Sequence, residues 1–474
     1  SAASDVYKRQ ERYCQELAMK KLFGTDGVRG EANVFPISPD LVLKLGQAIG
    51  LYFKSTLSHP RILIGKDTRL SGYMLEQALA SGICSVGVDA QFLGPLPTPG
   101  IAYLTRGLRA SAGIVISASH NPYSDNGIKI FSANGYKLPD DVEELLERML
   151  DDPNLIDNLP TGAGIGRAKR IDDAIGQYAV YLKEQFPKQL TLDGLRLVID
   201  CAHGAAYRVA PKVFTELGAE CFLLGVEPNG TNINDGYGAL HPQRLVEQVK
   251  LYKADVGLAF DGDADRLVVV DDKGEIIDGD EILAICGIQM VKQGTLKKNT
   301  VVSTVMSNMG LDIALERVGA ELRRTKVGDR YVMEEMVKGD FNLGGEQSGH
   351  LIFRDSATTG DGILAALHLL KIMVSEGRKI SDLKKCMERL PQVLRNVRVK
   401  SKVPLEDLPD LAKLIRQMEQ KLGKGGRILF RYSGTESLAR IMVEGQNSDE
   451  IEAIATELCT ETAAAIMNHK GQVQ

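Results

Sequence analysis

Three aspartates at alternate positions, Asp261, Asp263 and Asp265, separate two apolar runs of the chain. On a helix, residues two apart point in different directions, whereas in a looped segment alternate side chains can share one side. Three neighbouring carboxylates repel one another unless a cation lies among them, and their hard oxygen atoms suit Mg²⁺ or Mn²⁺ better than Zn²⁺. The spacing therefore predicts a metal site, with an acidic surface turn as the alternative. An EF-hand is excluded, because Asp272 stands where that loop needs a glutamate and both flanks have the pattern of strands.

Ser119 and His120 follow a short apolar run, Gly113 to Ile116, which is rich in β-branched residues and has the pattern of a buried strand. Pro122 prevents a regular continuation of that strand. In open α/β sheets, reacting groups lie beyond the carboxyl ends of strands. Ser119 is therefore a candidate nucleophile or phosphate carrier with His120 beside it. An ordinary turn of serine, asparagine and proline is the alternative.

A third polar loop spans residues 344–350, where glycines flank Glu346, Ser348 and His350. A carboxylate and a hydroxyl side by side can bind sugar hydroxyls or an amine. The adjacent glycines Gly344 and Gly345 predict a turn. A hairpin turn with polar residues and no ligand is the alternative interpretation.

A fourth polar loop begins where the apolar strand pattern of residues 427–430 ends, and it contains Arg431, Ser433, Gly434 and Thr435. Backbone N–H groups, two hydroxyls and a guanidinium fork can together hold a phosphate. The stretch is not a P-loop, because no lysine follows its glycine. A plain hairpin turn is again the alternative.

The glycine-rich stretch 24–30 permits a close backbone approach to a ligand, and Arg29 and Thr25 could meet an anion there. A glycine turn with a solvated arginine is an equally good interpretation of this stretch alone. The loops gain meaning together. A serine, a metal cage, a sugar-binding loop and a phosphate clamp describe phosphoryl transfer on a phosphosugar.

The composition indicates a globular protein and excludes several classes of function. The 474 residues carry a net charge of −5 and a sequence pI of about 5.9, which does not favour binding to nucleic acid or to an anionic membrane. No apolar run approaches the roughly 20 residues of a transmembrane helix. Seven widely spaced cysteines without a Cys-x-x-Cys motif are typical of reduced thiols in the cytoplasm. Residues 1–18 lack a signal-peptide pattern and are expected to be a disordered extension outside the fold.

The segments between these loops predict the elements that position them. Strand-like and helix-like segments alternate from residue 40 to residue 376, which indicates βαβ units. The predicted strands are 61–65, 90–93, 113–116, 195–199, 220–224, 256–260, 267–270 and 300–304. The predicted helices are 75–86, 99–106, 140–150, 173–186, 207–217, 242–252, 281–292, 309–318 and 361–376. Beyond Pro391 the pattern changes to strands at 393–399, 426–430 and 440–444 with helices near 406–421 and 448–467.

The predicted fold class is α/β, with three similar α/β domains that contain mixed sheets and a smaller C-terminal α+β domain. A proline- and glycine-rich linker at residues 152–166 separates the first block from the second. The expected domains are residues 19–170 with the serine loop, 171–273 with the metal loop, 274–386 with the sugar loop and 387–474 with the phosphate loop.

The loops in order resemble the α-D-phosphohexomutase superfamily. The resemblance covers nearly the whole chain from Met19 onward, and it includes the stretches 23–30, 117–122, 327–332 and 358–362 besides the loops around Asp261 and Glu346. The metal loop has Ala264 where the superfamily usually has a third glycine. The resemblance implies four domains arranged around a central active-site cleft, each contributing one loop.

The resemblance also implies roles for individual residues. Ser119 would become a phosphoserine and would bind Mg²⁺, one ion per active site, together with Asp261, Asp263 and Asp265. The substrate-binding residues would be Glu346, Ser348, Arg431, Ser433, Gly434 and Thr435. The other catalytic residues would be His120, Lys129, Arg29, Arg266 and His350. Which of these is the acid and which the base is left open.

The implied activity is the interconversion of glucosamine 6-phosphate and glucosamine 1-phosphate through a 1,6-bisphosphate intermediate, feeding UDP-N-acetylglucosamine and cell-wall synthesis. Glucosamine or glucose 1,6-bisphosphate would act as an activator. A phosphomannomutase or phosphoglucomutase of the same superfamily is the nearest alternative. A non-catalytic phosphosugar-binding regulator and a phosphatase that uses Asp261 as nucleophile are more distant alternatives. The expected partner is a phosphosugar, without nucleic acid or membrane, in the cytoplasm; a homodimer is left open.

Overall fold

The computed structural model of the chain describes residues 22–24, 26–57, 59–157, 159–433 and 437–469. The predicted extension 1–18, and Gly434 and Thr435 of the phosphate loop, lie outside the described residues. The described part contains four sheets, which belong to three α/β domains and a smaller C-terminal domain. The predicted fold class is confirmed.

Domain 1 is built on a sheet with strand order β1-β5-β4-β2-β3-β6, in which β1, β5 and β4 pair antiparallel and β4, β2, β3 and β6 pair parallel. Its strands are β1 (Val28–Glu31), β2 (Arg61–Lys66), β3 (Asp89–Pro95), β4 (Ala112–Ile116), β5 (Asp125–Ser132) and β6 (Ala168–Arg170). Its helices are α2 (Pro39–Thr56), α3 (Leu70–Ser85), α4 (Thr98–Gly107) and α5 (Asp140–Leu150). All five residues of β4 are buried, because the strand lies inside the sheet.

Domain 2 contains a sheet with strand order β11-β10-β9-β7-β8. Its strands are β7 (Arg196–Asp200), β8 (Glu220–Leu224), β9 (Val256–Phe260), β10 (Leu267–Asp271) and β11 (Ile276–Ile277), and its helices are α6 (Ala174–Glu184), α7 (Val209–Glu216) and α8 (Gln243–Tyr252). Strands β9 and β10 pair antiparallel, from Phe260 opposite Leu267 to Val256 opposite Asp271. The segment that carries Asp261, Asp263 and Asp265, here called the aspartate loop, is therefore the turn of a hairpin whose two strands are apolar.

Domain 3 contains a sheet with strand order β13-β12-β14-β15. Its strands are β12 (Thr300–Thr304), β13 (Glu321–Thr325), β14 (Leu343–Gly345) and β15 (Leu351–Phe353), and its helices are α9 (Gly279–Lys292), α10 (Met309–Glu316), α11 (Asp329–Gly339), α12 (Gly362–Glu376) and α13 (Ile380–Leu383). A capping box begins α9, in which Asp278 and Glu281 each accept a hydrogen bond from the other's backbone N–H. Gly377 caps the C-terminus of helix α12 with a φ of 62°, a left-handed conformation that glycine adopts without the strain a Cβ would cause.

Domain 4 is an antiparallel sheet with strand order β16-β18-β17 and two helices. Its strands are β16 (Gln392–Arg398), β17 (Gly426–Tyr432) and β18 (Leu438–Gly445), and its helices are α14 (Pro409–Leu422) and α15 (Ser448–His469). Helix α14 presents a narrow apolar stripe, formed by Leu411, Ile415 and Met418, to the domain core.

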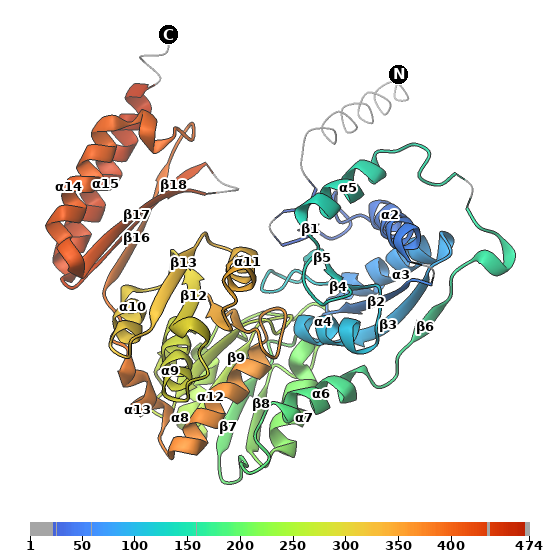
Figure 1. Cartoon of the computed structure of the whole chain (residues 1–474), viewed down its shortest axis with the longest axis horizontal. Coiled ribbons are helices and arrows are strands. Elements are labelled where there is room, and N and C mark those ends of the chain that lie inside the picture. The colour runs from blue at the N-terminus through green and yellow to red at the C-terminus, as the bar shows by residue number, and fades with distance from the viewer. Residues whose placement is uncertain (1–21, 25, 58, 158, 434–436, 470–474) are drawn as a thin grey trace.

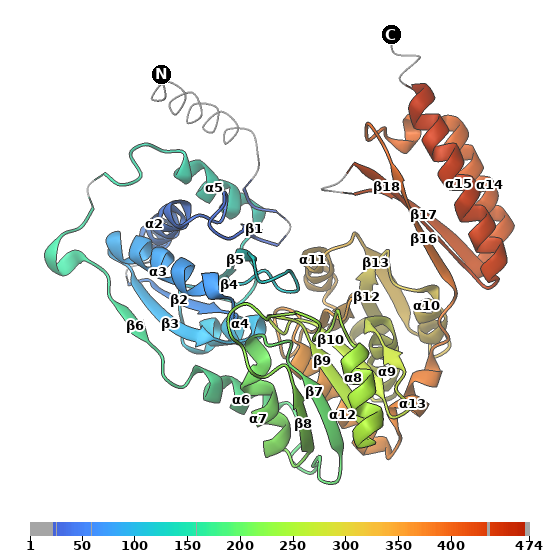
Figure 2. The same ribbon diagram turned by 180° about the vertical axis from the view of Figure 1, so that it is seen from behind.

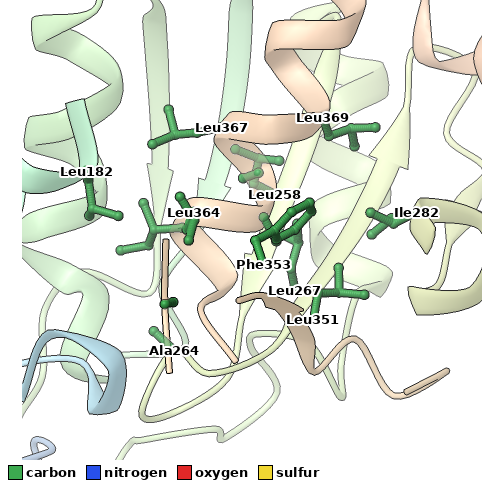
Figure 3. Close-up of a cluster of buried hydrophobic side chains, with 14 of the residues drawn as sticks. Leu182, Leu258, Ala264, Leu267, Ile282, Leu351, Phe353, Leu364, Leu367 and Leu369 are labelled. Carbon is green, nitrogen blue, oxygen red and sulfur yellow. The ribbon is translucent and has the colours of Figure 1, made fainter. Parts of the chain in front are cut away.

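One hydrophobic core runs through domains 1, 2 and 3, whereas domain 4 has a core of its own. Figure 3 shows part of the shared core, where Leu258 and Leu267 of the aspartate hairpin lie among residues of α12, α9 and β15. Ala264, inside the aspartate loop itself, is fully buried in this core. Apolar packing therefore holds the aspartate loop in place, in addition to the hydrogen bonds of the turn itself.

Domain 4 is attached differently from the other three domains. In both views domain 4 stands apart from the elements of domain 1, while domains 1, 2 and 3 lie against one another (Figures 1 and 2). Domain 4 attaches to domain 3, where Glu444 accepts a hydrogen bond of 2.8 Å from the Met309 N–H and Arg427 donates to the Ser307 carbonyl. The Gly445 N–H also bonds to the carbonyl of Pro391, in the connecting segment, at 3.2 Å.

The predicted turn at Gly344 and Gly345 is wrong, because both residues belong to strand β14. Gly344 pairs with Ile352 and Gly345 with Leu351. A Cβ at either glycine would meet neighbouring atoms within 2.6 Å, so these glycines permit close packing inside the sheet and do not form its turn. The turn lies at residues 346–349.

Several elements were not predicted, among them α2, β5 and α11. Strand β5 begins at a polar segment and contains a buried lysine, which obscures the strand pattern. Among the helices of the described residues, none has the length and apolar character needed to cross a membrane.

Candidate active site

Ser119 lies just beyond the carboxyl end of β4, as the sequence predicts, but its side chain is buried. Its backbone has a φ of 52°, which is rare for a residue with a Cβ and costs on the order of 1 kcal/mol. The hydroxyl donates a hydrogen bond of 2.6 Å to Asp261 Oδ2 and lies 3.2 Å from Nδ1 of His120. The serine of domain 1 is therefore directly paired with the aspartate loop of domain 2.

The three aspartates converge as predicted. One oxygen from each of Asp261, Asp263 and Asp265 lies within 4.8 Å of the others, and all three side chains are buried. Burial, followed by repulsion from the other two carboxylates, raises the pKa of Asp261 well above its ordinary value. The Oδ1 atoms of Asp263 and Asp265 are buried without a hydrogen-bond partner, and Arg266 Nε lies 3.9 Å from Asp265 Oδ1. Buried, unpartnered carboxylate oxygens at this spacing fit a hard divalent cation.

The backbone of the aspartate loop is shaped to approach the serine. Ala264 has a φ of 58°, which explains why a glycine is usual at this position of the superfamily. A Cβ on Gly262 would lie 2.5 Å from the Ser119 carbonyl oxygen, so only glycine lets the two loops approach this closely. Thr98 also fixes the loop, because its hydroxyl donates to Asp263 Oδ2 at 2.7 Å.

Lys129, on β5, supplies the buried positive charge of the cluster. Its ammonium group lies 3.0 Å from Asp263, 3.2 Å from Asp26 and 3.6 Å from Asp265. Burial lowers the pKa of Lys129, but the attraction of these three carboxylates outweighs burial and raises it above its ordinary value. Lys129 therefore stays protonated and acts through its charge.

A second charged cluster joins domain 1 to domain 3. Lys137 forms ion pairs with Asp26 and, at 2.6 Å, with Asp329 at the first turn of α11. His350 lies between Asp265, 3.7 Å from Nδ1, and Asp329, 3.5 Å from Nε2. Burial lowers the pKa of His350, but the two aspartates raise it to about 9. The cluster therefore carries alternating charges from the metal loop to the edge of domain 3.

His120 and His350 differ in charge state. Burial lowers the pKa of His120 to about 4, with Arg266 and Arg29 adding to the shift. His120 is therefore neutral near pH 7 and can accept a proton. The two aspartates instead favour the protonated form of His350, whose Nε2 accepts the Gly360 N–H at 3.1 Å in this structure. The two histidines, which the sequence treats as equivalent candidates, are suited to opposite roles.

A cavity of about 440 Å³ opens above the serine. The cavity contains the predicted residues Arg29, Ser119, His120, Asp265, Arg266, Glu346 and His350, together with Asp26, Gly328 and Asp329, which were not predicted as site residues. Its lining comes from loops of domains 1, 2 and 3. The Glu346 carboxylate accepts a hydrogen bond of 3.0 Å from the Gly328 N–H, which fixes it at the wall of the cavity.

Three predicted substrate-binding residues are not in that lining: Ser348, Arg431 and Ser433. Ser348 is exposed at the turn after β14. Arg431, at the end of β17, stands directly opposite Arg440 on β18. Two like charges paired across strands repel each other, and burial together with Arg440 lowers the pKa of Arg431. An anion bound near this pair would relieve the repulsion.

Several residues around the site carried too weak a sequence signal. Asp26 lies in the glycine-rich stretch, and Asp329 lies in the stretch 327–332 that contributes to the superfamily resemblance, but neither was predicted to belong to the site. Lys137 and Arg69 are single charged residues in ordinary surroundings of the sequence. A single lysine or arginine usually lies on the surface, so only the three-dimensional structure distinguishes these two.

Family models match all four domains in order. The matches are to phosphoglucomutase/phosphomannomutase alpha/beta/alpha domain I over residues 20–155, domain II over residues 176–274, domain III over residues 278–390 and the C-terminal domain over residues 394–461.

Individual proteins are similar over nearly the whole chain. A protein from Citrifermentans bemidjiense named phosphoglucosamine mutase is 56% identical over 442 residues, which cover 93% of this chain and 97% of the relative. A phosphoglucomutase/phosphomannomutase family protein from Burkholderia thailandensis has a similar fold, with a TM-score of 0.78 at 24% identity, covering 94% of this chain and 97% of that one. The N-acetylphosphoglucosamine mutase of Aspergillus fumigatus, solved with GlcNAc-6P and magnesium, has a TM-score of 0.65 at 16% identity, covering 94% and 96%.

Proposed function

This chain belongs to the phosphoglucomutase/phosphomannomutase family, and we propose that it interconverts glucosamine 6-phosphate and glucosamine 1-phosphate. One observation carries the proposal: a relative named phosphoglucosamine mutase is 56% identical along 93% of the chain. The geometry supports the same chemistry, because the Ser119 hydroxyl meets a carboxylate of the aspartate cluster at the floor of the cavity. The reaction is an intramolecular phosphoryl transfer.

Ser119 carries the phosphoryl group in this proposal. The phosphoserine gives its phosphoryl group to the free hydroxyl of the sugar phosphate. The bond from phosphorus to Ser119 Oγ breaks, a bond to the sugar oxygen forms, and the proton of the sugar hydroxyl passes to Ser119 Oγ. The product is a 1,6-bisphosphate. After the bisphosphate turns over, Ser119 Oγ loses its proton and attacks the other phosphorus. The bond between that phosphorus and the sugar oxygen breaks, the sugar oxygen takes up a proton, and the phosphoserine is regenerated.

The aspartate cluster would hold one Mg²⁺ ion together with the phosphoserine. The oxygen-only donor set of Asp261, Asp263 and Asp265 suits Mg²⁺. When bound, the ion would neutralise charge on the transferring phosphoryl group. The buried unpartnered oxygens of Asp263 and Asp265 support the presence of a cation.

The basic residues would divide the remaining work. Lys129, Arg29 and Arg266 stay positively charged and would stabilise the phosphoryl oxygens. His120, neutral and 3.2 Å from the serine hydroxyl, would accept the proton of Ser119 when that hydroxyl attacks. His350, whose pKa the neighbouring aspartates raise, would supply positive charge at the sugar side of the cavity when protonated.

The sugar and its second phosphate would be held from the far side of the cavity. Glu346, fixed by the Gly328 N–H, can accept hydrogen bonds from an amine or from hydroxyls. Ser348 would join it once a sugar enters. Arg431 and Ser433, with Gly434 and Thr435, would hold the phosphate that is not reacting.

A product assay with glucosamine, glucose and mannose 6-phosphates in parallel tests the proposed reaction. We expect the 1-phosphate to form fastest, by kcat/KM, from glucosamine 6-phosphate. A preference for glucose or mannose 6-phosphate would favour the alternative, a phosphoglucomutase or phosphomannomutase. Release of inorganic phosphate without a 1-phosphate product would instead indicate a phosphatase.

The remaining expectations are proposals of the same kind. Glucosamine or glucose 1,6-bisphosphate would activate the enzyme, because either can phosphorylate Ser119. We propose a cytoplasmic location and a phosphosugar as the partner, and domain boundaries near residues 170, 273 and 386. Sedimentation at several protein concentrations would distinguish a homodimer from a monomer.

A further inference from the structure

Arg69, at the residue before α3, is fully buried beneath the loop of residues 117–125, here called the serine loop. Its guanidinium group donates to carbonyl oxygens of the serine loop at Ser119 (2.9 Å), Asn121 (2.8 Å), Asp125 (3.1 Å) and Pro122. We infer that Arg69, held by Asp67, is a positioning residue that fixes Ser119 for phosphoryl transfer. The inference rests on the proposed function of Ser119 as phosphoryl carrier.

Asp67 also holds the serine, on the side of its backbone N–H. Its carboxylate accepts hydrogen bonds from Arg69 Nε at 2.8 Å and from the Ser117 hydroxyl at 2.6 Å. The Ser117 hydroxyl in turn accepts the Ser119 N–H at 2.9 Å. The carbonyl of Ser119 is therefore held by Arg69 directly, and its N–H is held by Asp67 through Ser117.

Asn234, from domain 2, repeats the contact from the opposite side. Its side-chain amide donates to the carbonyls of Ser119 at 2.9 Å and Asn121 at 3.1 Å. These are two of the carbonyls that Arg69 binds. The serine loop is thus hydrogen-bonded both to a guanidinium group of its own domain and to a side-chain amide of the domain that carries the aspartates.

Ser119 needs these hydrogen bonds from Arg69 and Asn234 because its backbone conformation is unfavourable. A residue with a Cβ at a φ of 52° keeps that conformation only where its surroundings enforce it. A relaxation of the loop would move the hydroxyl away from Asp261, which lies 2.6 Å away. Only arginine offers five N–H donors in one rigid plane, so lysine cannot reproduce the set of contacts.

Arg69 is not itself in the cavity lining, and these contacts reach the lining only through the Ser119 carbonyl, so its effect on the reaction must pass through the serine loop. A misplacement of about 1 Å at a reacting group can lower the rate roughly 100-fold. We expect substrate binding to be retained, because the cavity residues that face the sugar belong to other loops. A fall in kcat with little change in KM is therefore the signature of the inferred role.

The test compares Arg69→Lys with Asn234→Ala and with the control Lys66→Met in the full-length protein. Lys66 is a matched control, since it is also buried, precedes the same helix and pairs with Glu76 without contacting the serine loop. Hydrogen exchange of the peptide over residues 117–126 measures how firmly the loop is held. The kcat and KM for glucosamine 6-phosphate measure the consequence, and the melting temperature reports whether each variant folds.

For Arg69→Lys we expect faster exchange in the 117–126 peptide, a roughly 100-fold lower kcat and a KM within about twofold of the wild-type value. For Asn234→Ala we expect the same pattern with a smaller loss, about tenfold in kcat, because Arg69 still holds the loop. Lys66→Met should change neither loop exchange nor kcat by more than about twofold. Should Arg69→Lys fail to fold, Ser117→Ala, which breaks the link from Asp67 to the Ser119 N–H, is measured in its place with the same expected pattern.

The inference is wrong if loop exchange in Arg69→Lys and Asn234→Ala equals that of Lys66→Met, or if their losses appear in KM with kcat unchanged. Failure of the proposed function looks different. In that case the wild-type protein converts none of the three hexose phosphates, while the exchange measurement, which needs no activity, still shows whether Arg69 and Asn234 hold the loop.

Discussion

The serine–aspartate centre and the phosphate loop of domain 4 are built in opposite ways. Ser119, Lys129 and the three aspartates are buried and bonded to one another across the boundary of domains 1 and 2. Arg431 is only partly buried, stands opposite another arginine and lies outside the cavity lining. The first region shares a hydrophobic core with its neighbours, whereas domain 4 has a separate core.

This difference corresponds to the two demands of the proposed reaction. Phosphoryl transfer needs groups that are already in place, because reorganisation at the reacting centre raises the barrier. The bisphosphate must also turn over between the two transfers, which a rigid enclosure would prevent. A fixed centre and the proposed phosphate clamp on a separate domain would satisfy both demands, and changes at the two places should have different kinetic consequences.

The largest effect is expected for Ser119→Ala, which removes the phosphoryl carrier from the fixed centre. Activity should fall by at least about 1,000-fold, because the covalent route is lost. The wild-type serine is buried and bonded to Asp261, so a small change in melting temperature is also expected. Steady-state rates with phosphate release as a second readout check this. A variant with more than about a tenth of the wild-type rate would exclude Ser119 as the carrier.

Asp263→Asn should have the next largest effect, roughly 100-fold in activity, together with weaker Mg²⁺ binding. The substitution keeps the size of the side chain but removes one charge from the cluster, which also weakens the ion pair with Lys129. Metal titration calorimetry and rates at increasing Mg²⁺ measure both effects, and high Mg²⁺ should partly restore activity. Unchanged metal affinity in Asn variants of all three aspartates would rule out the metal site.

At the clamp, Arg431→Ala should raise KM about tenfold and lower kcat less, since Arg431 would hold the non-reacting phosphate. Free bisphosphate should accumulate when phosphorylated enzyme meets glucosamine 6-phosphate, because the intermediate escapes before it turns over. Arg398→Ala, an exposed arginine on the same sheet, is the control. Wild-type KM without bisphosphate release in Arg431→Ala would mean that this loop is not the clamp.

Glu346 lies between the two regions, at the wall of the cavity in domain 3. Glu346→Gln keeps the shape but removes the charge, so kcat/KM should fall more for glucosamine 6-phosphate than for glucose 6-phosphate, by about 1–3 kcal/mol if a charged hydrogen bond to the amine is lost. Parallel kinetics with the two sugars measure this difference. Equal losses would show that the carboxylate does not recognise the amine.

The smallest effect on activity is expected at the attachment of domain 4, where Asp280 binds the Asn308 N–H at 2.8 Å and Asn308 in turn binds Leu390. Burial, followed by repulsion from Asp278, raises the pKa of Asp280 to about 7, although the Asn308 N–H, Ser307 and Arg324 oppose the shift. The folded state therefore retains a proton that the unfolded state loses near pH 4. As a result, the stability of the wild type falls as pH rises from about 4 to about 7.

Asp280→Asn should remove this fall, because an amide does not titrate. The gain in unfolding free energy over the wild type should grow with pH to at most roughly 4 kcal/mol above pH 7, which corresponds to the difference of about three between the two pKa values. Urea unfolding at pH 5, 6, 7 and 8 measures it, while kcat should change less than twofold. Parallel stability curves for the two proteins would contradict the assignment.

The sequence alone determined most of the fold class and the principal chemical groups. Alternation of strand and helix patterns, the aspartates at every second position and the serine after an apolar strand are local signals, because each follows from neighbouring residues and the period of one element. The glycines at 344 and 345 show the limit of such signals. Glycine favours a turn locally, but here it allows tight packing within a strand.

Only the tertiary structure decided which charged residues serve the site. Arg69, Asp26, Lys137 and Asp329 come from separate segments, and their roles depend on partners up to about 190 residues away, as in the Lys137–Asp329 pair. The opposite pKa shifts of His120 and His350 likewise depend on burial and on carboxylates or guanidinium groups brought close by folding. Desolvation and long-range pairing set these properties, and neither is encoded in the spacing of residues along the chain.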